Sequence, residues 1–159
     1  YVMDKDGKEY RFDTYPTDPG YEMKAANLLN PDEATPKISD FSVWNDDGEY
    51  TEEILMGTKI IFVFHDVSKS STKNVSEMKE LAEASEVETW ILTSSGYDLF
   101  ETFRHENQIA LPFFYADATV LKAMIRSNPG VLVFQDGVVK GKWHYNALPS
   151  SEEISKLIR

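Results

Sequence analysis

Two serines, Ser68 and Ser71, occupy the stretch FHDVSKSSTKNVSEM at residues 64–78, between an apolar run and a helix-like pattern. A serine hydroxyl at such a place becomes a nucleophile only when a general base activates it. His65 and Asp66 are close enough in sequence to suggest a Ser-His-Asp site. Neighbouring residues on a strand point to opposite faces, however, so the geometry of this group with Ser68 is not specified.

A structural role explains the same residues more simply. Ser68, Ser71 or Asn74 is a suitable N-cap for the helix that follows. Asn74 with Glu77 has the spacing of a capping pair, which would start the helix at that point. We therefore favour helix capping over catalysis for this stretch.

The chain contains no cysteine, which excludes disulfides, thiolate catalysis and thiolate metal ligands. The segments DKDGKE and NDDGEYTEE resemble the start of a calcium loop, but both lack its spacing and closing glutamate. Asp-Gly turns explain them, with a structural calcium ion as the alternative. The three histidines lie far apart in sequence: His65, His105 and His144. We expect no metal and no cofactor.

The charge and hydropathy of the chain restrict its partners. A net charge of −11 repels phosphate backbones, so we expect no nucleic acid partner. No apolar run approaches the roughly 20 residues of a membrane helix. The sequence begins with Tyr1 rather than Met, so we expect a fragment or a processed product, whose membrane segment would lie outside this chain.

From residue 59 onward, strand and helix patterns alternate. The expected strands are KIIFVF at 59–64, VETWILT at 87–93, LPFFYAD at 111–117, and a strand pair around the Asp136-Gly137 turn. Helices are expected after Asn74, from Ser95 with Asp98, after Asp117, and from a Ser150–Glu153 capping box. This order, β-α-β-α-β-α-β-β-α, predicts a mainly parallel sheet with an antiparallel edge and helices on both faces.

Residues 1–36 read as a separate arm. DKDGKEYRF predicts a hairpin around Asp6-Gly7, and a short helical pattern covers 21–29. Four prolines, Pro16, Pro19, Pro31 and Pro36, favour an extended arm or linker. A second hairpin, turning at Asp47-Gly48, is expected within 40–53.

Residues 37–159 resemble the thioredoxin-like fold, in particular its TlpA, ResA and peroxiredoxin-like branch. KIIFVFHDVSKSS is similar to the first strand and C-x-x-C motif of that family, with Ser68 and Ser71 at the cysteine positions. SNPGVLVFQDGVVKGKW is similar to the loop and hairpin that hold the cis-proline, which Pro129 matches. The helix and strand at 97–117 match the insertion of that branch. The resemblance implies a three-layer α/β sandwich with a central mixed sheet, preceded here by a Pro-rich extension.

The departures from the family are equally informative. A serine hydroxyl stays protonated where the family has a reactive thiolate, so it cannot exchange with disulfides. The buried acid of ordinary thioredoxins is replaced by Phe62, and the tryptophan before the motif by Val67. Engineered cysteine-to-serine changes would not explain these two residues. The resemblance therefore implies a natural loss of redox function.

The most favoured function is a redox-inactive binding or accessory module, with a protein or peptide partner in the cis-proline groove. Ser68, Ser71, Asn128 and Pro129 would border that groove. The alternatives are an enzyme with non-thiol chemistry at the same groove, and a structural or assembly domain whose groove is filled by the N-terminal arm. The opening DGKEYRF and the Pro-rich arm also resemble the region after the membrane bundle in DoxX-like (DoxD-like) bacterial proteins, which implies tethering to a membrane protein and favours the periplasmic side.

Overall fold

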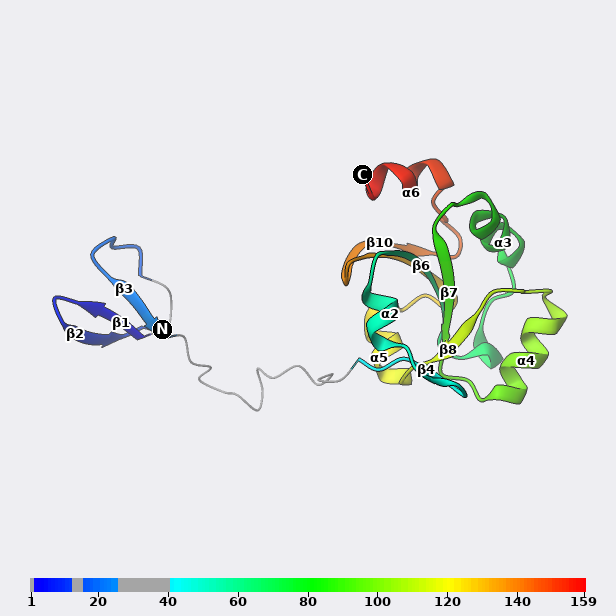
Figure 1. Ribbon diagram of the computed structural model, residues 1–159, viewed down its shortest axis with the longest axis horizontal. Coiled ribbons are helices and arrows are strands. Elements are labelled where there is room, and N and C mark those ends of the chain that lie inside the picture. The colour runs from blue at the N-terminus through cyan, green and yellow to red at the C-terminus, as the bar shows by residue number, and fades with distance from the viewer. Residues whose placement is uncertain (1, 13–15, 26–40) are drawn as a thin grey trace. The chain divides into compact units, whose positions relative to one another are not determined.

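The structure, a computed structural model, describes residues 2–12, 16–25 and 41–159 (Figure 1). The chain divides into two compact units, Tyr1–Ser39 and Asp40–Arg159. The expected boundary between residues 36 and 37, together with Pro31 and Pro36, lies outside the described residues.

The first unit contains a three-stranded sheet in the order β2-β1-β3, in which β1 pairs antiparallel with both neighbours. The strands are β1 (Val2–Lys5), β2 (Lys8–Arg11) and β3 (Glu22–Ala25). Asp6 and Gly7 have φ angles of 55° and 74°. A two-residue hairpin turn whose twist matches its strands requires positive φ at both positions. The hairpin predicted around Asp6-Gly7 is therefore present.

The helical pattern expected over 21–29 is wrong for residues 22–25, which form β3, and residues 26–29 lie outside the described part. Pairing with β1 overrides the weak local preference, because a strand gains backbone hydrogen bonds that a short isolated helix cannot match. Tyr21 packs edge-on against Tyr10 and Phe12, with ring centroids 5.5 Å and 5.1 Å away. Aromatic packing thus accompanies the extended conformation.

The second unit is built on a seven-stranded sheet in the order β10-β9-β6-β7-β8-β4-β5. Its strands are β4 (Trp44–Asn45), β5 (Gly48–Glu49), β6 (Thr58–Phe64), β7 (Glu88–Thr93), β8 (Phe113–Tyr115), β9 (Gly130–Gln135) and β10 (Val138–His144). Only β6 with β7 and β7 with β8 pair in parallel, and the other neighbours are antiparallel. The sheet is therefore mixed, as the resemblance implied, and the mainly parallel sheet expected from the order of the elements is corrected.

The direction of β9 explains this correction. For the next strand to run parallel to β8, the chain would have to cross back from the C-terminal end of β8 to the N-terminal end of the parallel strands before it re-entered the sheet. The intervening helix α5 (Ala118–Met124) has seven residues and rises only about 10 Å, about half the length of β7. The chain then reaches Asn128 beside the loop that follows β6. β9 therefore starts next to the C-terminal end of β6 and runs antiparallel to it.

The hairpin expected at Asp47-Gly48 turns one residue earlier, at Asp46-Asp47. The Asn45 side chain accepts the N–H groups of Asp47 and Gly48 at 2.8 Å and 3.2 Å. An asparagine that binds the backbone just ahead of it in this way stabilises a turn. The short helix α2 (Thr51–Leu55), whose Ile54 is fully buried, was not expected from the sequence.

The remaining helices are α3 (Val75–Ala84), α4 (Tyr97–Glu106), α5 and α6 (Ser151–Leu157). Asp117 caps α5 by accepting the N–H groups of Thr119 and Val120, as predicted. Ser150 and Glu153 form the predicted capping box. Ser95 does not cap α4, which begins after Gly96; its hydroxyl instead accepts the Val67 N–H at 3.0 Å.

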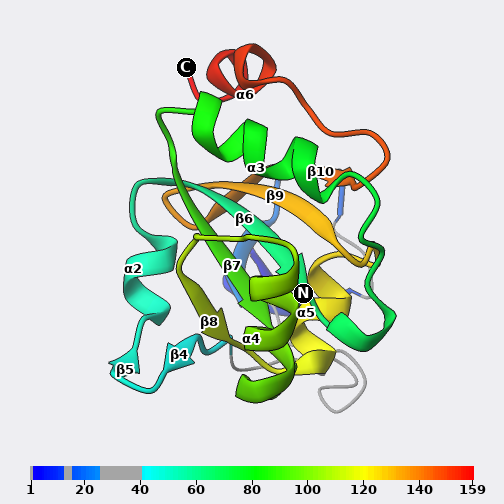
Figure 2. The same ribbon diagram turned by 90° about the vertical axis from the view of Figure 1, so that its right-hand side faces the viewer.

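Helices cover both faces of this sheet (Figure 2). On one face, α3, α4 and α6 bury Met78, Phe100 and Ile154 against alternate residues of β6, β7 and β9. On the other, α2 and α5 bury Ile54 and Leu121 against the intervening residues of the same strands. Strand side chains alternate between faces, so the central strands are apolar on both. The second unit is a three-layer sandwich. The loop after β6 follows the C-terminal end of a central strand of its sheet.

Candidate functional site

The segment between β6 and α3 does not place the two serines at the head of a helix. A 3₁₀ turn, η1 (Val67–Lys69), contains Ser68, and α3 begins only at Val75, four residues after Ser71. Capping of α3 by either serine is therefore wrong. Asn74 does occupy the N-cap position, but with φ of 64° and no capping hydrogen bond from its side chain. The Asn74 side chain donates instead to the Tyr145 carbonyl at 2.9 Å.

Asp66 organises the turn that contains Ser68. Its carboxylate accepts the Ser68 N–H at 3.1 Å, the Ser68 hydroxyl at 2.6 Å and the Lys69 ammonium at 3.0 Å. These donors, the Ser68 hydroxyl first, lower the pKa of Asp66 to about 2. A carboxylate with so low a pKa is a weak base at neutral pH, so Asp66 stabilises the turn without activating Ser68.

Asn128 joins the loop after β6 to the loop before β9, in a group of contacts that we call the Asn128 clasp. Its carbonyl accepts the Ser71 N–H at 3.1 Å, and its side-chain oxygen accepts the Ser70 hydroxyl at 2.7 Å. Its side-chain nitrogen donates to the Asp66 carbonyl at 2.7 Å. The peptide bond from Asn128 to Pro129 is cis.

The residues expected at the groove therefore lie around one junction, but with unequal access. Ser68 is exposed, Ser71 and Asn128 are half-buried, and Pro129 is buried. Pro129 can shape this surface but offers little area to a partner. Ser70, which contacts Asn128, was not predicted, because the C-x-x-C spacing points to Ser68 and Ser71. The Asp-x-Ser pattern at 66–68 signals a side-chain-capped turn, and it could have identified Asp66.

His65 does not complete a catalytic group with these serines. Its Nε2 lies 3.5 Å from the Arg126 carbonyl, and its Nδ1 is buried without a hydrogen-bond partner among the described residues. No hydrogen bond joins His65 to Ser68 or Ser71. Serine catalysis requires a base within hydrogen-bond reach of the hydroxyl, and here the Ser68 hydroxyl is directed to Asp66.

The described residues contain no group of three or more His, Asp or Glu side chains placed to hold a metal ion. Within the same part of the chain, no helix has the length and apolarity needed to cross a membrane.

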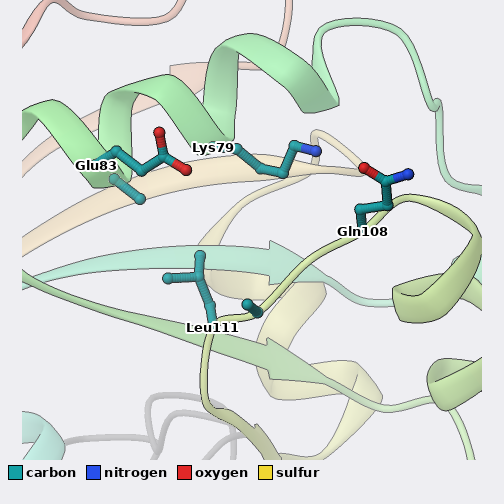
Figure 3. Close-up of a pocket in the computed structure, with 6 residues that line it drawn as sticks. Lys79, Glu83, Gln108 and Leu111 are labelled. Carbon is teal, nitrogen blue, oxygen red and sulfur yellow. The ribbon is translucent and has the colours of Figure 1, made fainter.

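A separate hollow of about 280 Å³ lies between α3 and the loop that leads from α4 to β8 (Figure 3). Lys79 and Glu83 approach it from α3, and Gln108 and Leu111 from the loop. The Lys79 ammonium donates to the Asn107 carbonyl at 3.1 Å, which holds the loop against the helix. None of the residues predicted for the groove lines this hollow.

No family model matches the chain, and no curated protein matches it significantly. Among solved structures, it is similar to a proposed thioredoxin of Neisseria meningitidis, with 16% identity and a TM-score of 0.53 over 73% of this chain and 83% of that one. It is also similar to a proposed thiol-disulfide oxidoreductase of Bacteroides vulgatus, with 14% identity and a TM-score of 0.50 over 76% of this chain and 84% of that one.

These likenesses, together with the mixed sheet between two helical layers, show that the chain has the thioredoxin-like fold. At such low identity they show the fold alone. The chain has no cysteine in its 159 residues, so it contains no thiol for disulfide exchange. The fold is thus present without the reactive group of the proteins that it resembles.

Proposed function

We propose that this chain is a redox-inactive thioredoxin-like domain that acts as a binding or accessory module for a protein or peptide partner. The observation that carries the proposal is the Asn128 clasp, which joins the two loops around Ser68 and Ser71, the residues that we match to the cysteine positions of the family, although no thiol is present. An ordered surface lowers the entropy cost of binding.

The partner segment lies across Ser68 and Ser71 and along the half-buried Asn128. The Asn128 carbonyl already accepts the Ser71 N–H, so its contribution to a partner is limited to any remaining lone pair. Recognition therefore depends on exposed residues close to the clasp in sequence, namely Ser68, Lys69 and Arg126. Lys69 also pairs with Asp66, and the positive charges of Lys69 and Arg126 favour a partner segment with carboxylate or carbonyl acceptors near the clasp.

A random-peptide display selection against the domain tests this role. Peptides that bind at the groove should bind Ser71→Arg at least about tenfold more weakly, because the large charged side chain covers the clasp. Ser76→Arg, at an exposed position of α3, is the matched control and should leave binding unchanged. Selected peptides that bind both variants as tightly as the unchanged chain would contradict the proposed groove.

We further propose that the domain belongs to the TlpA-like branch and is attached to a DoxX-like membrane protein through a segment outside this chain. The branch assignment is supported by the helix and strand expected within residues 97–117, which form α4 and β8. The complete reading frame tests the attachment directly. Four hydrophobic spans before Tyr1 would support it, and recovery of the native protein entirely in the soluble fraction would contradict it.

A further inference from the structure

Among the described residues, a cation lies over an aromatic ring beside a carboxylate at three places. The three groups, each given as cation, ring and carboxylate, are Lys5 with Tyr21 and Asp18, Lys59 with Trp90 and Glu88, and Arg104 with Phe113 and Glu101. The distances from cation to ring centroid are 4.7, 5.1 and 5.8 Å. A cation over a ring face is attracted by the ring quadrupole, and the carboxylate adds an ionic contact.

A further group of aromatic rings, two of them exposed, lies at the β8-β4-β5 end of the sheet. Trp44 lies directly opposite Tyr115, with ring centroids 6.4 Å apart. Phe113 is 5.9 Å from Tyr115, and Tyr97, at the start of α4, is 6.4 Å from Phe113. We call these four residues the aromatic strip. Paired residues share a face, as do residues two apart on a strand, so Trp44, Tyr115 and Phe113 face the same side.

The two ends of the strip are open. α4 covers Phe113, whose ring lies 4.7 Å from Phe100 and beneath Arg104. Trp44 and Tyr97 are 41% and 53% exposed, whereas large aromatic side chains are usually well covered. Figure 2 shows β4 and β8 beside α4, so this surface is formed by strand edge and helix together. Within residues 41–159, no Lys or Arg lies over Trp44, Tyr97 or Tyr115.

Carboxylates surround the strip. The pKa of Tyr115 is raised by burial and, to a smaller extent, by the negative charges of Asp46, Tyr97 as phenolate, Glu101 and Asp98. A hollow of about 510 Å³ beside Tyr97 is lined by Asp98, Glu101, Thr102, His105 and Glu106. Glu101 is already paired with Arg104, but Asp46 and Asp98 form no ion pair with described residues.

We propose that the aromatic strip, with Asp46 and Asp98, binds an extended arginine- or lysine-bearing segment of a partner protein. Arg104 lies over Phe113 beside Glu101, but no Lys or Arg of residues 41–159 lies over the other three rings of the strip, which also have carboxylates nearby. Its two exposed rings, Trp44 and Tyr97, lie at opposite ends of the strip, which suits a segment with more than one basic side chain. The acidic net charge of −11 draws such a segment towards the chain and repels nucleic acid.

Fluorescence anisotropy with a labelled, acetylated peptide that alternates arginine with glycine tests the proposal at about 0.15 M salt. The unchanged chain should bind this peptide and not its glutamate counterpart. Trp44→Ala and Tyr97→Ala should each weaken binding between about threefold and thirtyfold, the range expected for loss of one cation–π contact. Both residues are substantially exposed, so at least one variant should keep its circular dichroism spectrum and melting temperature.

Two double variants separate a specific site from general attraction to an acidic chain. Asp46→Asn with Asp98→Asn should weaken binding at least about fivefold, whereas Glu80→Gln with Glu86→Gln, which changes the net charge equally at exposed positions, should change it less than about twofold. Equal effects of the two pairs, or unchanged binding by both folded aromatic variants, would overturn the proposal, as would absence of binding. Ser71→Arg should leave this binding intact, so its outcome is distinct from that of the proposed groove.

Discussion

The Ser71 N–H donates to the Asn128 carbonyl over 3.1 Å, and this contact fastens the loop after β6 to the loop before β9. The Asn128 side chain reinforces it by accepting from the Ser70 hydroxyl and donating to the Asp66 carbonyl. An asparagine side chain supplies a donor and an acceptor on two separate atoms, whereas a threonine has one hydroxyl for both roles and a leucine has neither. The junction is thus closed by amide and hydroxyl groups.

Asn128→Ala should therefore lower the free energy of unfolding by about 1–3 kcal/mol, because it removes both hydrogen bonds that the side chain makes in the clasp. Urea denaturation measures this change. Asn146→Ala removes an exposed asparagine from the loop after β10 and should change stability by less than about 0.5 kcal/mol. Similar losses for the two variants would mean that the clasp does not contribute to stability.

Restoring cysteines should not restore redox activity. In Ser68→Cys with Ser71→Cys, the first thiol would lie beside the Asp66 carboxylate and seven residues before α3 begins. A neighbouring negative charge raises a thiol pKa, and the helix dipole acts only within the first turn. We expect insulin reduction at the uncatalysed rate and slow alkylation at neutral pH.

The matched variant adds Asp66→Asn to the two cysteines, which removes the negative charge and leaves Lys69 nearby. Alkylation of Cys at position 68 should then become faster at neutral pH. Rapid turnover of insulin by the simple double variant would show that this loop still has the geometry of a working redox site.

Much of this fold was predictable because local signals and packing agree. KIIFVF, VETWILT and the strand pair around Asp136-Gly137 are continuous apolar or alternating runs with clear turn residues. Asp117 and Ser150 with Glu153 cap their helices as their spacing indicates. Each of these features depends on neighbours within a few residues, which a single sequence displays directly.

The errors fall where long-range contacts decide the conformation. α3 begins directly after Asn74, as its spacing with Glu77 predicted, but the Asn74 side chain binds the distant Tyr145 carbonyl instead of capping the helix. Ser95 is a second example, because its hydroxyl accepts the N–H of the distant Val67 instead of capping α4. The contribution of Ser70 to the clasp likewise depends on Asn128, and no local pattern indicates that partner.

Stability should depend on pH through Asp66. Its pKa is about 2 in the folded chain because the Ser68 hydroxyl and Lys69 ammonium favour the carboxylate, whereas an unfolded aspartate titrates near about 3.9. The folded state thus binds fewer protons between these values, so this contribution is present above about pH 4 and is lost as pH falls towards 2. Urea midpoints should decline over that window, and less steeply in Asp66→Asn. Glu86→Gln controls for removal of a carboxylate, and equal slopes in both variants would argue against this role of Asp66.

The capping box of α6 should be measurable by itself. The Ser150 hydroxyl accepts the Glu153 N–H at 3.2 Å, and the Glu153 carboxylate accepts the Ser150 N–H at 2.8 Å. Ser150→Ala should cost about 1 kcal/mol of unfolding free energy, since α6 holds the fully buried Ile154 in the core. Thermal denaturation against Ser151→Ala, which changes the next serine without removing the cap, provides the comparison. A cost for Ser151→Ala as large as for Ser150→Ala would rule out the capping explanation.

Gly141 leaves room for the ring of Trp143 on β10. A Cβ added at residue 141 would lie 2.1 Å from the Trp143 ring, far inside van der Waals contact. The ring is rigid and packs against the buried core, so it cannot yield as a flexible chain end would. Gly141→Ala should therefore destabilise the domain by about 1–3 kcal/mol. Combining it with Trp143→Leu should recover part of that loss relative to Trp143→Leu alone, which a double-mutant cycle measures. Gly96→Ala, where nothing lies within 4 Å of the added Cβ, is the control, and additive costs at 141 and 143 would disprove the steric explanation.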